Sequence, residues 1–167
     1  MKKVFTISFC FFGLLFSSSV FAQATATATA SATIVTPISI SKTTDMNFGN
    51  IATDGTVGTV ILAPGSTRTF TGGVTLPAAT GTVTAASFTV AGSGSYTYAI
   101  TLPSSVTITS GSDSMIVDTF TSTPSSTGTL SSGSQVITVG ATLNLVASQA
   151  EGTYTSATPF AVTVNYN

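Results

Sequence analysis

The chain has 167 residues, of which only 5% are charged; it has no histidine and a single cysteine, Cys10. Without histidine, neither a Ser-His-Asp nor a Cys-His catalytic system can form, and imidazole metal sites are excluded. Lysine and arginine together number four, too few for the clustered basic surface that nucleic-acid binding requires. The composition therefore predicts a non-enzymatic protein with no cofactor, no metal and no nucleic-acid partner.

The N-terminus has the pattern of a secretory signal peptide, which we assign to residues 1–22. Two lysines precede an apolar run that is too short to span a bilayer, and Val20 and Ala22 stand before the expected cleavage point. Cleavage there removes Cys10 and leaves 145 residues with two basic and five acidic side chains, a net charge of −3. We expect a mature protein without disulfides or a membrane span, exported across the inner membrane to the cell surface or a fimbria.

Residues 23–33 form an Ala/Thr-rich N-terminal extension ahead of a domain predicted over residues 34–167. The extension has the period-two pattern of a strand but little hydrophobic weight, so alone it is not expected to fold. Its even-numbered face, continued into the domain, consists of Ala24, Ala26, Ala28, Ala30, Ala32 and Ile34.

The rest of the chain reads as about ten short strands separated by turn signals every 8 to 12 residues, which is typical of an all-β, immunoglobulin-like β-sandwich. The predicted strands are residues 34–40, interrupted by Pro37, then 46–51, 57–62, 68–74, 87–91, 96–102, 106–108, 115–120, 136–146 and 160–166. Gly-Ser-Gly-Ser at residues 92–95 predicts a hairpin turn, and residues 121–134 predict a Ser/Thr/Gly loop. The aromatic side chains of the mature chain are expected in the core.

The five acidic residues lie in or beside predicted turns, so we expect no catalytic carboxylate pair. Asp45 with Asn47, or Asp113 with loop carbonyls, remains a weaker alternative as a calcium site. The triplet Asp113-Ser114-Met115 resembles the short acceptor of an O-glycosylation system found in some Gram-negative bacteria, which makes Ser114 a candidate glycosylation site. The alternative is that Asp113 is only a turn residue before a strand.

The last residues predict a half-buried strand that ends one residue before the chain terminus. Its two faces differ sharply: one carries small or polar side chains, whereas the other is apolar. The apolar face consists of Phe160, Val162, Val164 and Tyr166.

Seven segments in order along the mature chain resemble the bacterial DUF4402 domain family. They read PISI at 37–40, MNFGNI at 46–51, FTVAG at 88–92, YAITLP at 98–103, VGATL at 139–143, GTY at 152–154 and VTVNY at 162–166. This family is similar in turn to pilin-like adhesins of the spore coat U and archaic chaperone-usher type. The resemblance implies an immunoglobulin-like sandwich that lacks one strand.

In such a subunit, a periplasmic chaperone lends the missing strand until the N-terminal extension of the next subunit replaces it at an usher. The resemblance implies that Phe160, Val162, Val164 and Tyr166 border the vacant position, and that the even face of residues 23–34 is the donor. Because that face is mainly alanine, the extension is alternatively a tether. Two other functions stay open: a stand-alone module that binds glycans or surfaces through residues 121–134, and, as the weakest, ice binding through the Thr pattern.

Overall fold

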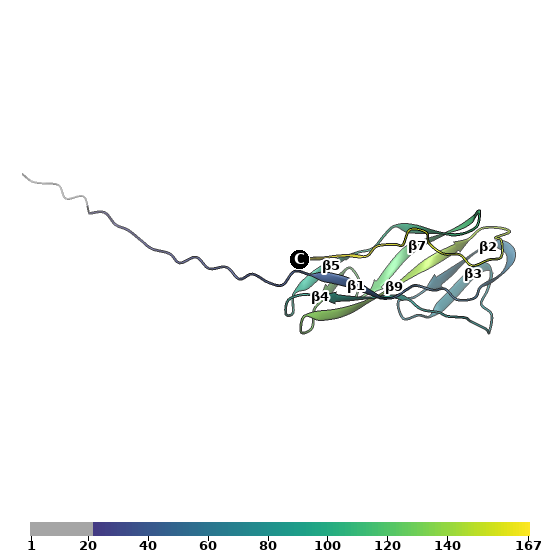
Figure 1. The fold of residues 1–167 in the computed structure, drawn as a ribbon, viewed down its shortest axis with the longest axis horizontal. Helices are drawn as coiled ribbons and strands as arrows, with labels where there is room; N and C mark the ends of the chain where they lie inside the picture. The colour runs from purple at the N-terminus through teal and green to yellow at the C-terminus, as the bar shows by residue number, and fades with distance from the viewer. Residues whose placement is uncertain (1–21) are drawn as a thin grey trace, which may run out of the picture. The chain divides into compact units, whose positions relative to one another are not determined.

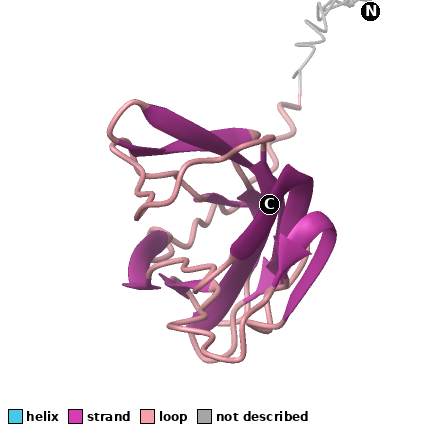
Figure 2. Ribbon diagram, turned by 90° about the vertical axis from the view of Figure 1, so that its right-hand side faces the viewer, coloured by secondary structure: helices cyan, strands magenta, loops and turns pink. Residues whose placement is uncertain are grey.

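A computed structural model describes residues 22–167. The predicted signal peptide, except Ala22, lies outside these residues together with Cys10. The compact unit is Ile34–Asn167, and its regular structure consists of strands alone (Figure 2). Residues 22–38 form no helix or strand, and nearly all of their side chains are exposed. Nowhere in the described chain is there a helix with the length and apolar character to cross a membrane.

Ten strands form two antiparallel sheets, so the predicted all-β sandwich is confirmed (Figure 1). The larger sheet has the order β1-β4-β9-β2-β3, with β7 on the other edge of β9 and β6 beyond β7; the smaller has the order β10-β5-β8. The strands are β1 Ser39–Thr44, β2 Ala52–Leu62, β3 Arg68–Thr75, β4 Ala86–Ala91, β5 Thr97–Thr101, β6 Ser105–Ser110, β7 Asp113–Thr123, β8 Thr127–Thr129, β9 Ser134–Leu145 and β10 Thr163–Tyr166.

Strand β9 organises the larger sheet. The first half of β9 pairs with β4 and the second half with β2 along one edge, while β7 pairs with the opposite edge. Its alternating pattern buries every second side chain from Ile137 to Leu145, as period-two pleating requires. At the change of partner stands Gly140, where a Cβ atom would collide with the carbonyl of Leu62, so only glycine fits this crossing.

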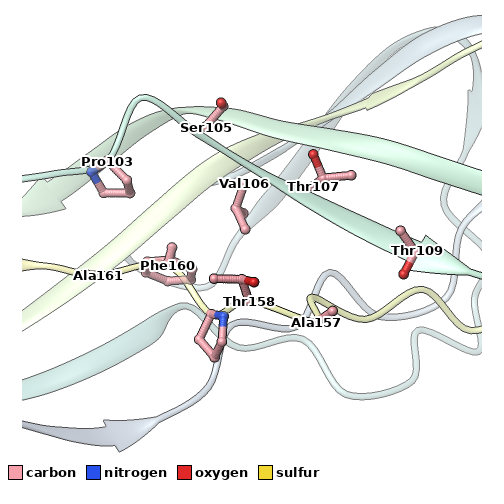
Figure 3. Close-up of a pocket in the computed structure, with 10 residues that line it drawn as sticks. Pro103, Ser105, Val106, Thr107, Thr109, Ala157, Thr158, Phe160 and Ala161 are labelled. Carbon is pink, nitrogen blue, oxygen red and sulfur yellow. The ribbon is translucent and has the colours of Figure 1, made fainter.

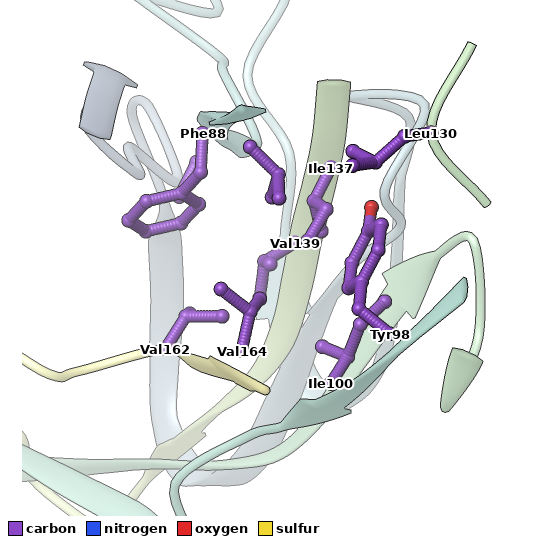
Figure 4. Packing of buried hydrophobic residues seen from close by; sticks show 10 residues of the cluster. Phe88, Tyr98, Ile100, Leu130, Ile137, Val139, Val162 and Val164 are labelled. Carbon is purple, nitrogen blue, oxygen red and sulfur yellow. The ribbon is translucent and has the colours of Figure 1, made fainter. Parts of the chain in front are cut away.

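The apolar core has two parts, and they are covered differently. In the first, β4 and β9 face the smaller sheet, and Phe88, Ile137 and Val139 pack against Tyr98 and Val164 (Figure 4). The second lies on the inner face of β2, β3, β7 and β9. Within residues 22–167, no strand of the smaller sheet contributes to this part. The partly buried side chains that pack against it come from irregular segments and from two strands of the larger sheet: Met46, Phe48, Ile51, Leu76 and Tyr154, with Val106 and Ile108 of β6 and Phe120 of β7.

Four predicted features are wrong in detail. Residues 46–51 form no strand beyond one bridge at Asn47, because their backbone is bound partly by isolated carbonyl and N–H groups of Thr80 and Thr84 and partly by side chains, not by a continuous partner strand. The first strand begins at Ser39, two residues after Pro37, which has no N–H to offer a ladder. Residues 121–134 are not a loop, since their start completes β7 and their middle forms β8. The strands flanking residues 92–95 do not form a hairpin, because β4 and β5 pair in different sheets.

The aromatic prediction holds for seven of the nine mature aromatic residues, which are buried or partly buried. Phe70 and Tyr96 are each 49% exposed. Phe70 lies on the edge strand β3, which has a partner on one side only, and Tyr96 stands just before β5, where its ring packs against Tyr166. Neither side chain is enclosed by both layers of the sandwich.

Candidate functional site: an apolar groove over the uncovered half of the sandwich

A groove of about 1080 Å³ lies over the second part of the core. Its floor includes Met115 and Val117 of β7 and Leu143 and Leu145 of β9, all of them nearly inaccessible to solvent. Its two walls are residues 46–51, here called the fixed wall, and the segment 149–160. The groove therefore lies over the inner face of the larger sheet, beside the segment that leads into β10.

The fixed wall is held mainly through its asparagines. The backbone of Asn47 exchanges hydrogen bonds of 2.8 and 3.0 Å with Thr84, and its side-chain oxygen accepts the N–H of Gly49 at 2.8 Å. Asn50 donates its backbone N–H to the carbonyl of Thr80 at 2.7 Å and its side-chain amide to Ala79 at 2.9 Å. These bonds satisfy the backbone without a neighbouring strand.

Gly49 is required for this path. Its φ is +69°, a left-handed conformation that costs other residues energy, and a Cβ atom would meet the carbonyl of Thr80. The resulting bend sends Met46, Phe48 and Ile51 toward the core, so the wall is apolar inside and hydrogen-bonded outside.

Arg68 fastens the same wall from β3. Its guanidinium donates to the carbonyl oxygen of Phe48 and, at 2.9 Å, to that of Asn50. Among the described residues the one ion pair joins Lys42 to Asp45. Arg68 therefore interacts with backbone carbonyl groups and not with a carboxylate. The sequence reading missed this role, although Arg68 is the only arginine in the chain, which was the available signal.

The opposite wall is less firmly held. Gln149 donates its side-chain amide to the hydroxyl of Tyr154 at 2.8 Å, and that hydroxyl donates to the carbonyl of Ala150 at 2.8 Å. The side-chain oxygen of Gln149 lines the groove, is buried and has no partner. A buried unpaired acceptor is uncommon, so this wall is incompletely hydrogen-bonded.

The predicted assembly strand is divided by the structure. Val164 and Tyr166 lie in β10, whereas Phe160 and Val162 precede it. Val162 and Val164 are 8% and 7% exposed, and the Phe160 ring packs against Phe88 and Phe120 with centroid separations of 6.4 and 5.0 Å. The apolar face thus points into the first part of the core.

Within the part of the chain that the structure describes, the outer edges of β1 and β10 have no partner strand. β10 pairs with β5 alone and β1 with β4 alone, and the two come close to each other. Tyr166 of β10 binds the segment before β1 and the turn after β4: its hydroxyl donates to the carbonyl of Thr36 at 2.9 Å and accepts the N–H of Ser93 at 2.6 Å. Free edges of this kind invite pairing with another chain.

The other predicted site residues are exposed. Every even-numbered residue from Ala24 to Ala32 is exposed and outside any strand, and Ile34 is 97% exposed. Ser114 is exposed near the start of β7, opposite Thr109 and just after the turn at Gly111. The structure neither gathers these residues into one site nor assigns them a ligand.

The acidic residues are dispersed. In residues 22–167 there is no group of three or more Asp, Glu, His or Cys that could hold a metal ion. The pKa of Asp54 is lowered, because the hydroxyl and the N–H of Thr56 donate to its carboxylate at 2.7 and 2.9 Å. These bonds lie where the pairing of β2 with β3 shifts register, between Thr53 and Gly58.

Comparison with known proteins gives one match. The model of a family described as a domain of unknown function, DUF4402, matches residues 38–166. No curated protein and no solved structure matches.

Proposed function

The chain belongs to the DUF4402 family, and we propose that it is a secreted, non-enzymatic structural subunit of pilin type that assembles by β-strand complementation. In this proposal the groove receives a strand from another chain. The donor in the fibre is residues 23–34 of a second copy, and a periplasmic chaperone and an usher serve the subunit before assembly.

The groove is the observation that carries the proposal. One half of the sandwich has two strand layers, whereas the other half has only the larger sheet under two irregular walls. Its floor is apolar, and the neighbouring edges of β1 and β10 are unpaired. An added strand would bury this floor and gain main-chain hydrogen bonds, the two terms that stabilise β-augmentation.

The N-terminal extension has the properties of an occupant. It carries no charge and alternates Ala with Thr or Ser, and eleven extended residues reach about 36 Å. Its small side chains match a groove that is already lined by the large side chains of Phe48, Met115 and Tyr154. The binding energy would therefore come mainly from backbone pairing along β10 and β1.

A truncation and a peptide test the proposal. The chain of residues 34–167 should unfold at a higher temperature when a peptide of residues 23–34 is added; at 100 times its Kd the stabilisation is about 2.7 kcal/mol. A matched pair of altered peptides tests which face of the extension enters the groove. Ala28→Asp places a charge on the proposed groove-facing side and should abolish the rise in unfolding temperature. Thr27→Asp places the charge on the outer side and should preserve the rise.

A truncated chain that is monomeric, unfolds cooperatively and is indifferent to all three peptides would contradict strand complementation and favour the stand-alone module. Electron microscopy of cells that make the full chain gives the second readout, because assembly predicts antibody-labelled filaments and a module predicts diffuse labelling.

A further inference from the structure

A second, smaller cavity opens between β6 and residues 157–161 (Figure 3). This slot has a volume of about 520 Å³ and is lined by Thr107 and Thr109 on one side and by Ala157 and Ala161 on the other. The segment that separates the slot from the groove, residues 156–162, is here called the strap. Pro159 and Phe160 of the strap line both cavities.

The strand register on the two sides of the slot is continuous. β10 pairs with β5 from Tyr166–Tyr98 to Thr163–Thr101. If this pairing is continued from Thr101 toward higher numbers and from Thr163 toward lower numbers, one residue at a time, it reaches the isolated bridge Thr109–Thr155 without an insertion on either side. The strap and residues 102–108 are therefore the two halves of a ladder whose ends are paired and whose middle is open.

Two prolines explain why the middle is open. Thr109 and Thr155 exchange both backbone hydrogen bonds, at 2.9 and 3.0 Å, so every second pair along this register is of the hydrogen-bonded kind. Pro103 would stand opposite Ala161, and Pro159 opposite Ser105, in two successive pairs of that kind. Proline has no N–H, so each of these pairs loses a ladder bond.

We propose that the strap is a movable wall with two positions. In one it lies between the slot and the groove, as in this structure; in the other it closes onto β6 and completes a continuous ladder from β10 to Thr155. Closing draws Pro159 and Phe160 away from the groove and widens it for an entering strand. The identity of that strand rests on the proposed function, whereas the two positions rest on the register and the prolines.

Paired cysteines measure the closure in the mature chain, residues 23–167, which lacks Cys10. The test pair is Thr107→Cys with Ala157→Cys, which face each other only in the closed ladder. The reference pair is Thr101→Cys with Thr163→Cys, which are already paired. A hydrogen-bonded antiparallel pair has Cα atoms about 5.5 Å apart, within the range for a disulfide.

The reference pair should oxidise at least tenfold faster than the test pair. Replacing both prolines, Pro103→Thr with Pro159→Thr, should bring the test pair to within about threefold of the reference, whose unchanged rate in the same background controls for folding. Equal rates in the unaltered background, or no acceleration after proline replacement, would overturn the two-position strap.

The peptide of residues 23–34 tests whether closure of the strap is coupled to binding in the groove. In the chain that keeps both prolines but lacks residues 23–33, it should accelerate the test pair at least tenfold and leave the reference pair unchanged. A peptide that raises the melting temperature without changing the test rate would refute the coupling. A peptide that does neither, while proline replacement still closes the ladder, would refute the proposed function and leave the strap proposal intact.

Discussion

Replacing Arg68 tests whether one cation fastens the fixed wall of the groove. In Arg68→Met the apolar stem is largely kept, while the donors to the carbonyls of Phe48 and Asn50 are lost. A hydrogen bond to a charged group contributes roughly 1.5–3 kcal/mol, and less where water can replace it. The bond to Phe48 is partly buried and the one to Asn50 is exposed, so we expect a loss of about 2 kcal/mol.

Urea unfolding measures this loss directly as a change in midpoint at constant slope. Lys42→Met is the matched control, because Lys42 is also a cation with a near partner, Asp45 at 2.7 Å, but both side chains are more than half exposed. Such surface pairs contribute about 0–1 kcal/mol. Arg68→Lys should fall between the two, since an ammonium group does not reproduce the fork of the guanidinium.

The reasoning is refuted if Arg68→Met and Lys42→Met destabilise the domain equally. It is also refuted if Arg68→Met is destabilised but binds the peptide of residues 23–34 as tightly as the parent, because a loosened wall should weaken the groove. The second outcome would confine Arg68 to stability and separate the fixed wall from strand binding.

Three further predictions concern other parts of the molecule. Burial raises the pKa of the Tyr98 hydroxyl. The neutral hydroxyl therefore contributes its full stability below about pH 10, and this stability is lost as the pH rises through the folded-state pKa. In a pH series of thermal melts, Tyr98→Phe should remove the alkaline loss of stability, whereas Tyr96→Phe should keep it. If Ser114 carries a glycan, the intact mass of natively exported protein exceeds the polypeptide mass and Asp113→Ala abolishes the excess; an unmodified native mass rejects the site. Phe160→Ala should cost about 2 kcal/mol in urea unfolding, below the 3–5 kcal/mol of a fully buried ring, because Phe160 is only partly enclosed; a cost under 0.5 kcal/mol would show that its ring contacts do not stabilise the fold.

Strands with one buried face could be predicted from sequence because burial imposes the alternation that the sequence displays. β9 and the residues around β10 are examples: Val139 and Leu143, or Val162 and Val164, recur at every second position and are buried. The same signal failed at residues 46–51. Met46 and Phe48 also alternate and also point into the core, but Asn47 and Arg68 supply hydrogen bonds to the backbone there. Hydrophobic periodicity does not indicate which groups bind the backbone of a segment.

The partners of each strand were harder to predict than the strands. The turn at residues 92–95 has hairpin composition, yet β4 and β5 belong to different sheets: β4 pairs with β1 and β9, whereas β5 pairs with β10 and β8. The slot shows the same limit. Pro103 and Pro159 stand far apart in the sequence, and their shared effect becomes visible only when the register from Thr101–Thr163 to Thr109–Thr155 places them in neighbouring pairs.

The two walls of the groove differ in a way that suits strand insertion. The fixed wall is tied to β3 by Arg68 and to residues 79–84 by backbone and side-chain bonds, so it keeps its position over the floor. The backbone of the strap is hydrogen-bonded only at its ends, by β10 and by the bridge at Thr155, and between them the side chains of Phe160 and Val162 hold it against the core. In the proposed assembly the rigid wall would set the register of an entering strand, and the movable one would give it access once the Phe160 ring leaves its contacts with Phe88 and Phe120. The proposed donor face is mainly alanine, so its side-chain burial contributes little to the binding free energy. We therefore expect the backbone hydrogen bonds that form when the strap closes onto β6 to contribute to the free energy of strand insertion.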